Sequence, residues 1–388
     1  MYTLTALLSL ASVYIFVLLL REGISSAQRH LWPSYVITST LGLYTHFYFA
    51  FIILFENIAF VAQWILRPTP EFTKSESTNP EFTNLRTWLL AQLCIVLLFL
   101  PWSRFVATRY AADATYWEGV LGLLTVAKDT FIAFSVGHTM GGKAADFAAL
   151  GFAALAAAGV LASLWERNNG LQDSMDVRVP SAFGLVLLYL LVPMGALFAI
   201  SYHRPKFAPR YLLSALPAFY LLMAIGLGKL ASSCQAWARG SRLLGAAALI
   251  GLLCSLSFVS VASASSLANY YFDEKYARPD LRSVAEYISS HAEAEDAIIL
   301  VGGHMLPAFT YYYRGNLPVH PLPERLVVST KEPLDYRSAD QLNSIGQRRD
   351  RLWLVLWQNR LADPTDVILD QLMLNLSLIH ISEPTRPY

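Results

Sequence analysis

Charged residues are scarce in this 388-residue sequence, at 15% of the total, whereas hydrophobic residues make up 55%. Soluble domains carry roughly a quarter charged residues, so the composition predicts a membrane protein with a soluble part. The formal net charge is only +1, and the excess of cations that nucleic-acid binding requires is missing. The expected surroundings are therefore a membrane, and nucleic acid is not an expected partner.

Cysteine is rare as well, with only Cys94, Cys234 and Cys254, each in or beside an apolar segment. Their spacing matches neither a zinc site nor a disulfide framework. The sequence also lacks a phosphate-binding glycine-rich loop and a nucleophile elbow. These absences exclude the common motifs of soluble nucleotide-binding proteins and hydrolases.

Long apolar segments dominate the first two thirds of the chain instead. A bilayer core of about 30 Å requires roughly 20 apolar residues in a helix. The region 33–66 is apolar nearly throughout, and as one helix it would be about 50 Å long, so we expect a break near His46–Ala50. The eight predicted spans are 2–20, 33–50, 51–66, 86–101, 144–164, 181–202, 211–230 and 243–262.

Lys and Arg in short loops predict how these spans are oriented. The loop 229–242 contains Lys229, Arg239 and Arg242 and no acidic residue, which predicts a cytoplasmic location. Met1 then falls outside, and we expect at least one further span upstream of it. The other segments predicted on the outer face are 103–143, 203–210 and everything after 263.

Residues 263–375 have a different pattern, in which short apolar strands alternate with helices. This pattern predicts a small outer α/β domain with a mostly parallel sheet, following a transmembrane domain at 1–262. The predicted strands are Ala297–Val301 and Leu352–Trp357. The predicted helices are Pro279–Ala292, Leu306–Tyr313 and Pro364–Leu372, with a short helix around Ser338–Arg348 inside a loop at 322–350. Residues 376–388 fit neither periodicity, and we interpret them as a non-native tail resembling translated adapter sequence.

Three cations, Arg204, Lys206 and Arg210, lie in one short hydrophilic loop between long apolar segments. Cations beside aromatic residues at a membrane face suit a lipid-linked phosphate. Lys and Arg also snorkel at helix ends for purely structural reasons. The spacing alone leaves both interpretations open.

Ionisable and polar groups inside the apolar segments are further candidates. His46, with Tyr44 nearby, and Glu56 lie within predicted spans, where such groups usually face a cavity or pair with a neighbouring helix.

In the outer loop, Asp113 and Glu118 are possible acid–base groups or solvated carboxylates. The stretch 117–136 predicts an interfacial helix, and Gly302-Gly303-His304 follows a strand at the expected ligand edge of the sheet or forms a simple turn.

Several segments together resemble bacterial GT-C glycosyltransferases, multi-span enzymes related to aminoarabinose transferases and protein mannosyltransferases. The segment RPKFAPRYLLSALPAFY at 204–220 resembles the Arg-Tyr-Leu helix entry of that family. The other similar segments are MYTL at 1–4, LYTH at 43–46, LFLPW at 98–102 and the start of an outer domain at 271–313. Their order along about residues 1–370 carries the resemblance.

This resemblance implies transfer of a sugar from a polyprenyl-phosphate donor to a lipid, glycan or protein acceptor. The reaction would occur at the outer face of the bacterial cytoplasmic membrane, either without metal or assisted by a divalent metal. Arg204, Lys206 and Arg210 would hold the donor phosphate, where fixed cations stabilise the charge of the leaving group. Tyr211, His46 and Tyr44 would contact the sugar or the lipid.

The sequence departs from the family pattern at its start. In the family the catalytic carboxylate lies in the first outer loop, so we expect the general base upstream of Met1. The chain is then expected to be a fragment, lacking the first span, the catalytic loop and the last strands of the outer domain, and inactive alone. Two other classes remain open: a transporter or flippase of lipid-linked intermediates, which would show internal repeats, and a membrane sensor with an outer ligand-binding domain.

Overall fold

A computed structural model describes residues 1–21, 30–66, 80–112, 122–168, 182–203, 207–276, 280–324, 334–335, 341–342, 344–346, 349, 351–357 and 359–375. The chain divides into two compact units. The helical unit comprises 1–106 with 119–272, and the α/β unit comprises 107–118 with 273–388. The predicted tail 376–388 lies outside the described residues.

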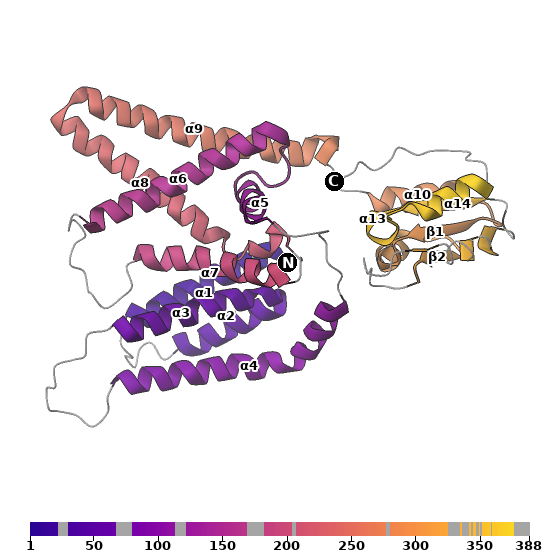
Figure 1. The fold of residues 1–388 in the computed structure, drawn as a ribbon, viewed down its shortest axis with the longest axis horizontal. Helices are drawn as coiled ribbons and strands as arrows, with labels where there is room; N and C mark the ends of the chain where they lie inside the picture. Colours follow the sequence, from indigo (N-terminus) through magenta and orange to yellow (C-terminus); the bar gives the residue numbers. More distant parts are fainter. Residues whose placement is uncertain are drawn as a thin grey trace. The chain divides into compact units, whose positions relative to one another are not determined.

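The helical unit consists of long apolar helices (Figure 1). Seven helices within the described residues are long and apolar enough to cross a membrane, which is compatible with a multi-pass membrane protein. The elements of this unit are α1 (Tyr2–Arg21), α2 (Leu31–Thr45), η2 (Phe47–Phe49), α3 (Ala50–Leu66), α4 (Pro80–Ala112), α5 (Leu123–Ser135), α6 (Gly142–Asn168), α7 (Ala182–His203), η3 (Pro209–Leu212), α8 (Leu216–Gly240) and α9 (Arg242–Phe272).

The predicted break in the apolar region 33–66 is confirmed at His46. His46 has an extended backbone (φ −158°, ψ 120°) between α2 and η2. The chain turns so tightly here that the ring of Phe49 occupies the position that a Cβ on Gly42 would take. Gly42 therefore permits the close packing of the two helices. With 15 residues, α2 is shorter than the seven candidate spans.

Two other boundaries differ from the prediction. The helix α8 begins at Leu216 rather than at 211, because residues 209–212 form the 3-10 helix η3 and residues 213–215 form turns. Pro217 lies in the first turn of α8, where a missing backbone N–H is tolerated. Of the stretch 117–136 predicted as an interfacial helix, Leu123–Ser135 forms α5, whose 13 residues are too few to span a bilayer, and residues 117–121 lie outside the described residues. In Figure 1, α5 is seen nearly end-on, whereas the long helices lie across the view.

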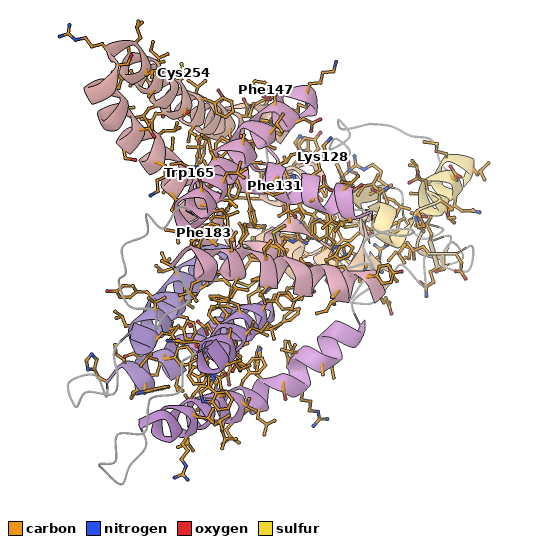
Figure 2. All side chains as sticks on the ribbon, turned by 60° about the vertical axis from the view of Figure 1, so that its left-hand side comes forward. Lys128, Phe131, Phe147, Trp165, Phe183 and Cys254 are labelled. Atoms are coloured by element: carbon orange, nitrogen blue, oxygen red, sulfur yellow. The ribbon has the colours of Figure 1, made fainter. Side chains whose placement is uncertain are left out.

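The helices form two groups. Figure 1 shows α1, α2, α3 and α7 side by side, while α6, α8 and α9 pack together. At the crossing of α6 and α8, Gly159 and Gly226 bring the two backbones into contact, and a Cβ on Gly226 would overlap the carbonyl oxygen of Leu155. Large apolar side chains, such as Phe147 and Trp165 of α6, point outward (Figure 2).

The α/β unit contains a three-stranded parallel sheet in the order β2-β1-β3, as the predicted parallel sheet requires. The strand β1 (Ala297–Val301) has the predicted bounds, and β3 spans Leu352–Leu356. The edge strand β2 (Val319–Leu322) was not predicted, because Pro321 interrupts its pattern; proline is tolerated at a sheet edge. The remaining elements are η4 (Glu274–Tyr276), α10 (Leu281–His291), η5 (Gly303–Met305), α11 (Leu306–Tyr312), α13 (Asn359–Ala362) and α14 (Val367–Asn375).

Side-chain caps set the helix starts in this unit. Asp280 accepts hydrogen bonds from the backbone amides of Arg282 and Ser283, so α10 begins at Leu281. The buried carboxylate of Asp363 accepts bonds from the first two amides of α14, which begins at Val367 instead of the predicted Pro364. Of the helix predicted around Ser338–Arg348, residues 341–342 and 344–346 are helical, and the rest falls outside the described residues.

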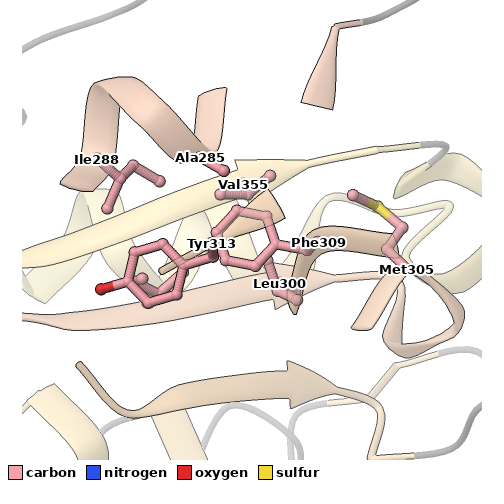
Figure 3. Close-up of a cluster of buried hydrophobic side chains, with 8 residues drawn as sticks. Ala285, Ile288, Leu300, Met305, Phe309, Tyr313 and Val355 are labelled. Atoms are coloured by element: carbon pink, nitrogen blue, oxygen red, sulfur yellow. The ribbon is translucent and has the colours of Figure 1, made fainter. Parts of the chain in front are cut away.

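Two apolar clusters cover the two faces of the sheet. On one face, Ile298 and Leu300 of β1 pack with residues of α10 and α11, including Phe309 (Figure 3). On the other face, Ile299 and Val301 pack with residues that include Leu342 and Ile368. All five residues of β1 are buried, which explains why a continuous apolar run identified this strand.

Candidate functional site

Four aromatic rings from three distant segments meet in the helical unit. The ring of Tyr211 in η3 lies 4.7 Å from the ring of Tyr48 and 5.8 Å from that of His46, measured between centroids. The ring of Tyr2, at the start of α1, lies 5.3 Å from that of His46. We call Tyr2, His46, Tyr48 and Tyr211 the aromatic cluster.

Arg210 adds a cation to this cluster. Its guanidinium carbon lies 5.6 Å from the centroid of the Tyr211 ring, within the range of a cation–π interaction. The same Tyr211 ring lies 5.8 Å from the His46 imidazole. The Arg210 side chain is exposed, whereas His46 is only 8% exposed. A solvent-accessible cation therefore borders a largely buried imidazole.

Local backbone structure holds the two sides of the cluster in place. His46 caps η2, since its Nδ1 accepts a hydrogen bond of 3.3 Å from the backbone amide of Tyr48. On the other side, the Ser214 carbonyl oxygen, just after η3, accepts from the hydroxyls of Ser9 (2.7 Å) and Tyr189 (2.9 Å). These bonds join the turn after η3 to α1 and α7.

Tyr44 is not part of the aromatic cluster. Its hydroxyl donates to the carbonyl oxygen of Leu98 at 2.9 Å, and its ring packs against Phe99 and Trp102 of α4. The predicted contact of Tyr44 with a sugar or lipid therefore has a different location from that of His46 and Tyr211. Tyr44 instead connects α2 to the part of α4 that ends in Pro101 and Trp102.

The structure describes only some of the predicted residues. Arg204 and Lys206, the other two predicted phosphate-binding cations, lie outside the described residues, as do Asp113 and Glu118. Two cluster members, Tyr2 and Tyr48, had no predicted role. Tyr2 occurs in the segment 1–4 that resembles the glycosyltransferase family, whereas Tyr48 lies two residues after the segment 43–46, and their aromatic character was the available signal.

Glu56 lies at the centre of a separate buried network. Its side chain is fully buried, and its carboxylate accepts hydrogen bonds from Ser12 (2.7 Å) and Tyr35 (2.8 Å). Gln92 of α4 donates to the Tyr35 hydroxyl at 3.2 Å, and Ser39 lies 3.1 Å from Ser12. The carboxylate thus joins α3 to α1 and α2, as the prediction of a structural partner for a neighbouring helix requires, and Tyr35 extends the network to α4.

Within the described ranges, no group of three or more His, Cys, Asp or Glu side chains could hold a metal ion. The aromatic cluster with Arg210 offers hydrogen-bond donors, a cation and ring surfaces, but no carboxylate. Such a set of groups suits the binding of an anionic, partly apolar ligand more than acid–base chemistry.

Comparison of this chain with models of protein families, with curated proteins and with solved structures finds no match.

Proposed function

We propose that this chain belongs to a membrane glycosyltransferase that moves a sugar from a polyprenyl-phosphate donor to a lipid, glycan or protein acceptor. The reaction would take place at the outer face of the bacterial cytoplasmic membrane. The observation that carries the proposal is the meeting of three segments, each similar to the GT-C family, around His46 and Tyr211.

In this proposal Arg210 holds the donor phosphate. A leaving polyprenyl phosphate carries negative charge, and a guanidinium binds phosphate oxygens through charge-assisted hydrogen bonds. The nearby phenol rings provide apolar faces for the sugar or the first isoprene units. Arg204 and Lys206 precede Arg210 in the same loop and are proposed to complete the phosphate site. Any divalent metal would be an accessory to these cations.

Binding of a fluorescent polyprenyl phosphate to the full chain in lipid nanodiscs tests this role without requiring turnover. Arg210→Ala should weaken binding about ten- to hundredfold, since a hydrogen bond to a charged group contributes about 1.5–3 kcal/mol. Arg210→Lys should retain part of the affinity, because it keeps the charge but not the fork of donors.

Arg242→Ala is the matched control, because Arg242 is also an exposed arginine at a helix boundary but begins α9. It should leave the affinity unchanged. Equal binding by the wild-type chain and Arg210→Ala would remove the phosphate role, and equal losses in Arg210→Ala and Arg242→Ala would indicate only nonspecific charge attraction.

A transporter of lipid-linked intermediates is the second candidate, and Glu56 is the observation that favours it. Buried carboxyl groups inside membrane helices occur in proton pathways. If Glu56 acts in this way, Glu56→Gln should stop passage of a fluorescent polyprenyl phosphate across a liposome bilayer, whereas Tyr35→Phe, which removes one hydrogen bond to Glu56 but keeps its carboxyl group, should not. Absence of passage in the wild-type chain would exclude this candidate.

A further inference from the structure

At the carboxyl edge of the parallel sheet, the connections after β1 and β3 pass to opposite faces, and the proposed transferase activity does not involve this edge. After β1 the chain enters α11, which packs on one face of the sheet through Phe309. After the neighbouring strand β3, the chain leads to α14, which packs on the other face through Ile368. Open α/β sheets bind ligands at the carboxyl edge where adjacent strands send their connections to opposite faces.

Gly302 brings the ends of the strands together at this position. Its amide donates to the carbonyl oxygen of Leu322 at the end of β2. A Cβ on Gly302 would lie 3.1 Å from the carbonyl oxygen of Trp357 and 3.2 Å from the ring of His304. With φ at +108°, Gly302 also has a backbone conformation that side-chain-bearing residues rarely adopt. The end of β1, the residue after β3 and an imidazole ring are therefore adjacent.

Polar side chains follow both strands here. His304 is half-buried in η5, directly after β1. Asn359, two residues after Trp357, donates to the carboxylate of Asp366 at 3.1 Å. Asp366 is exposed and is the one non-glycine residue with positive φ (51°) among the residues that the structure describes. We call Gly302, His304, Trp357, Asn359 and Asp366 the switch-point edge.

We propose that the switch-point edge binds a saccharide. An imidazole after β1 and a carboxamide and a carboxylate after β3 lie at one edge of the sheet, and such groups donate to and accept from hydroxyl groups, which is the chemistry that a sugar presents. The exposed carboxylate of Asp366 opposes an anionic ligand such as a phosphate or a carboxylate, and this favours a neutral one. The proposal uses only the α/β unit and does not depend on the transferase activity.

Saturation-transfer NMR on the full chain in nanodiscs tests the proposal, because this method detects weak binding. The probes are methyl α-mannopyranoside, N-acetylglucosamine and L-arabinose, and at least one should receive saturation from the protein. His304→Gln and Asp366→Asn should each weaken that binding about two- to tenfold, the loss expected for one hydrogen bond. Asn at position 366 tolerates the left-handed backbone, so this variant remains folded.

His291→Gln and Glu295→Gln are the matched controls, because both lie just before β1 at the opposite edge of the same sheet. They should leave saccharide binding unchanged. Saturation of none of the three sugars, equal losses in the controls, or displacement of the sugar by inorganic phosphate would overturn the proposal. Polyprenyl-phosphate binding, measured on the same samples, should respond to Arg210→Ala and not to Asp366→Asn, so the two proposals can fail separately.

Discussion

The helical unit and the α/β unit differ in how much apolar side-chain surface they leave exposed. In the α/β unit every residue of β1 is buried, as expected for a sheet that is covered on both faces. In the helical unit Glu56 and Ser12 are fully buried, while leucines of α4 such as Leu89 and Leu97 are more than half exposed. This distribution is compatible with a lipid bilayer, in which apolar surface is solvated and helices associate mainly through close packing and hydrogen bonds. The helical unit therefore adds close backbone contacts and polar networks to its buried aromatic residues such as Phe16 and Phe55, whereas the α/β unit relies on the apolar core around its sheet.

The largest effect is expected when the contact between α6 and α8 is disrupted, which tests whether close backbone packing stabilises the helical unit. Gly226→Ala places a methyl group against the carbonyl oxygen of Leu155, which is backbone and cannot rotate away. We expect the variant to lose more than about 3 kcal/mol of stability, above the usual cost of overpacking. Thermal unfolding in detergent, followed by tryptophan fluorescence, measures the loss.

Gly228→Ala is the control on the same helix, because a Cβ on Gly228 meets nothing within 4 Å. It should be neutral or stabilise the helix by up to about 1 kcal/mol, since alanine favours helix over glycine. No loss in Gly226→Ala, or the same small gain in both variants, would mean that helix propensity, and not the contact between α6 and α8, determines stability here.

The second prediction concerns a charged pair in the α/β unit. Asp296 is 1% exposed and accepts from the Arg351 guanidinium at 3.0 Å, from the indole of Trp353 at 2.9 Å and from the Glu293 amide. Burial opposes ionisation of this carboxylate. The hydrogen bonds from Arg351, Glu293 and Trp353 outweigh burial and hold the pKa of the carboxyl group below its usual value.

Asp296→Ala should therefore destabilise the α/β unit by about 2 kcal/mol at pH 7, mainly because it leaves buried donors without an acceptor. Since the pKa is lowered in the folded state, the contribution is complete above the unfolded pKa of about 3.9 and is lost as the pH falls through the folded value. Urea unfolding of both proteins from pH 7 to pH 3 should show a shrinking difference. A difference that stays constant over this range would contradict the role of the ionised carboxylate.

The sequence was more informative for the α/β unit than for the helical packing. The strand β1 was predicted correctly because an apolar run of five residues ends at Gly302. The edge strand β2 was missed because Pro321 interrupts the alternation of apolar and polar residues that identifies a strand. In the helical unit, the break at His46 followed from bilayer thickness, but the start of α8 did not, since the apolar pattern continues through η3.

The candidate site was only partly predictable. Arg210, Tyr211 and His46 were selected from separate segments, and the structure brings them together. Tyr44 contacts α4 instead, because it lies in the last turn of α2, where residues two positions apart do not share a face. The partners of Glu56 come from three other helices, and no spacing within one sequence specifies which helices become neighbours.

The smallest expected effect concerns a hydrogen bond that supports the aromatic cluster. The hydroxyl of Tyr189 is buried, lies 2.8 Å from that of Ser9 and donates to the carbonyl oxygen of Ser214. Tyr189→Phe should cost only about 0.6–1 kcal/mol, since hydrogen bonds between membrane helices contribute that little on average. Tyr44→Phe, which removes the more exposed hydroxyl bonded to Leu98, should cost less still. Thermal unfolding in detergent compares the two variants. A loss of several kcal/mol in Tyr189→Phe would show that a single hydrogen bond outweighs helix packing in this unit, because the ring and its contacts remain in place.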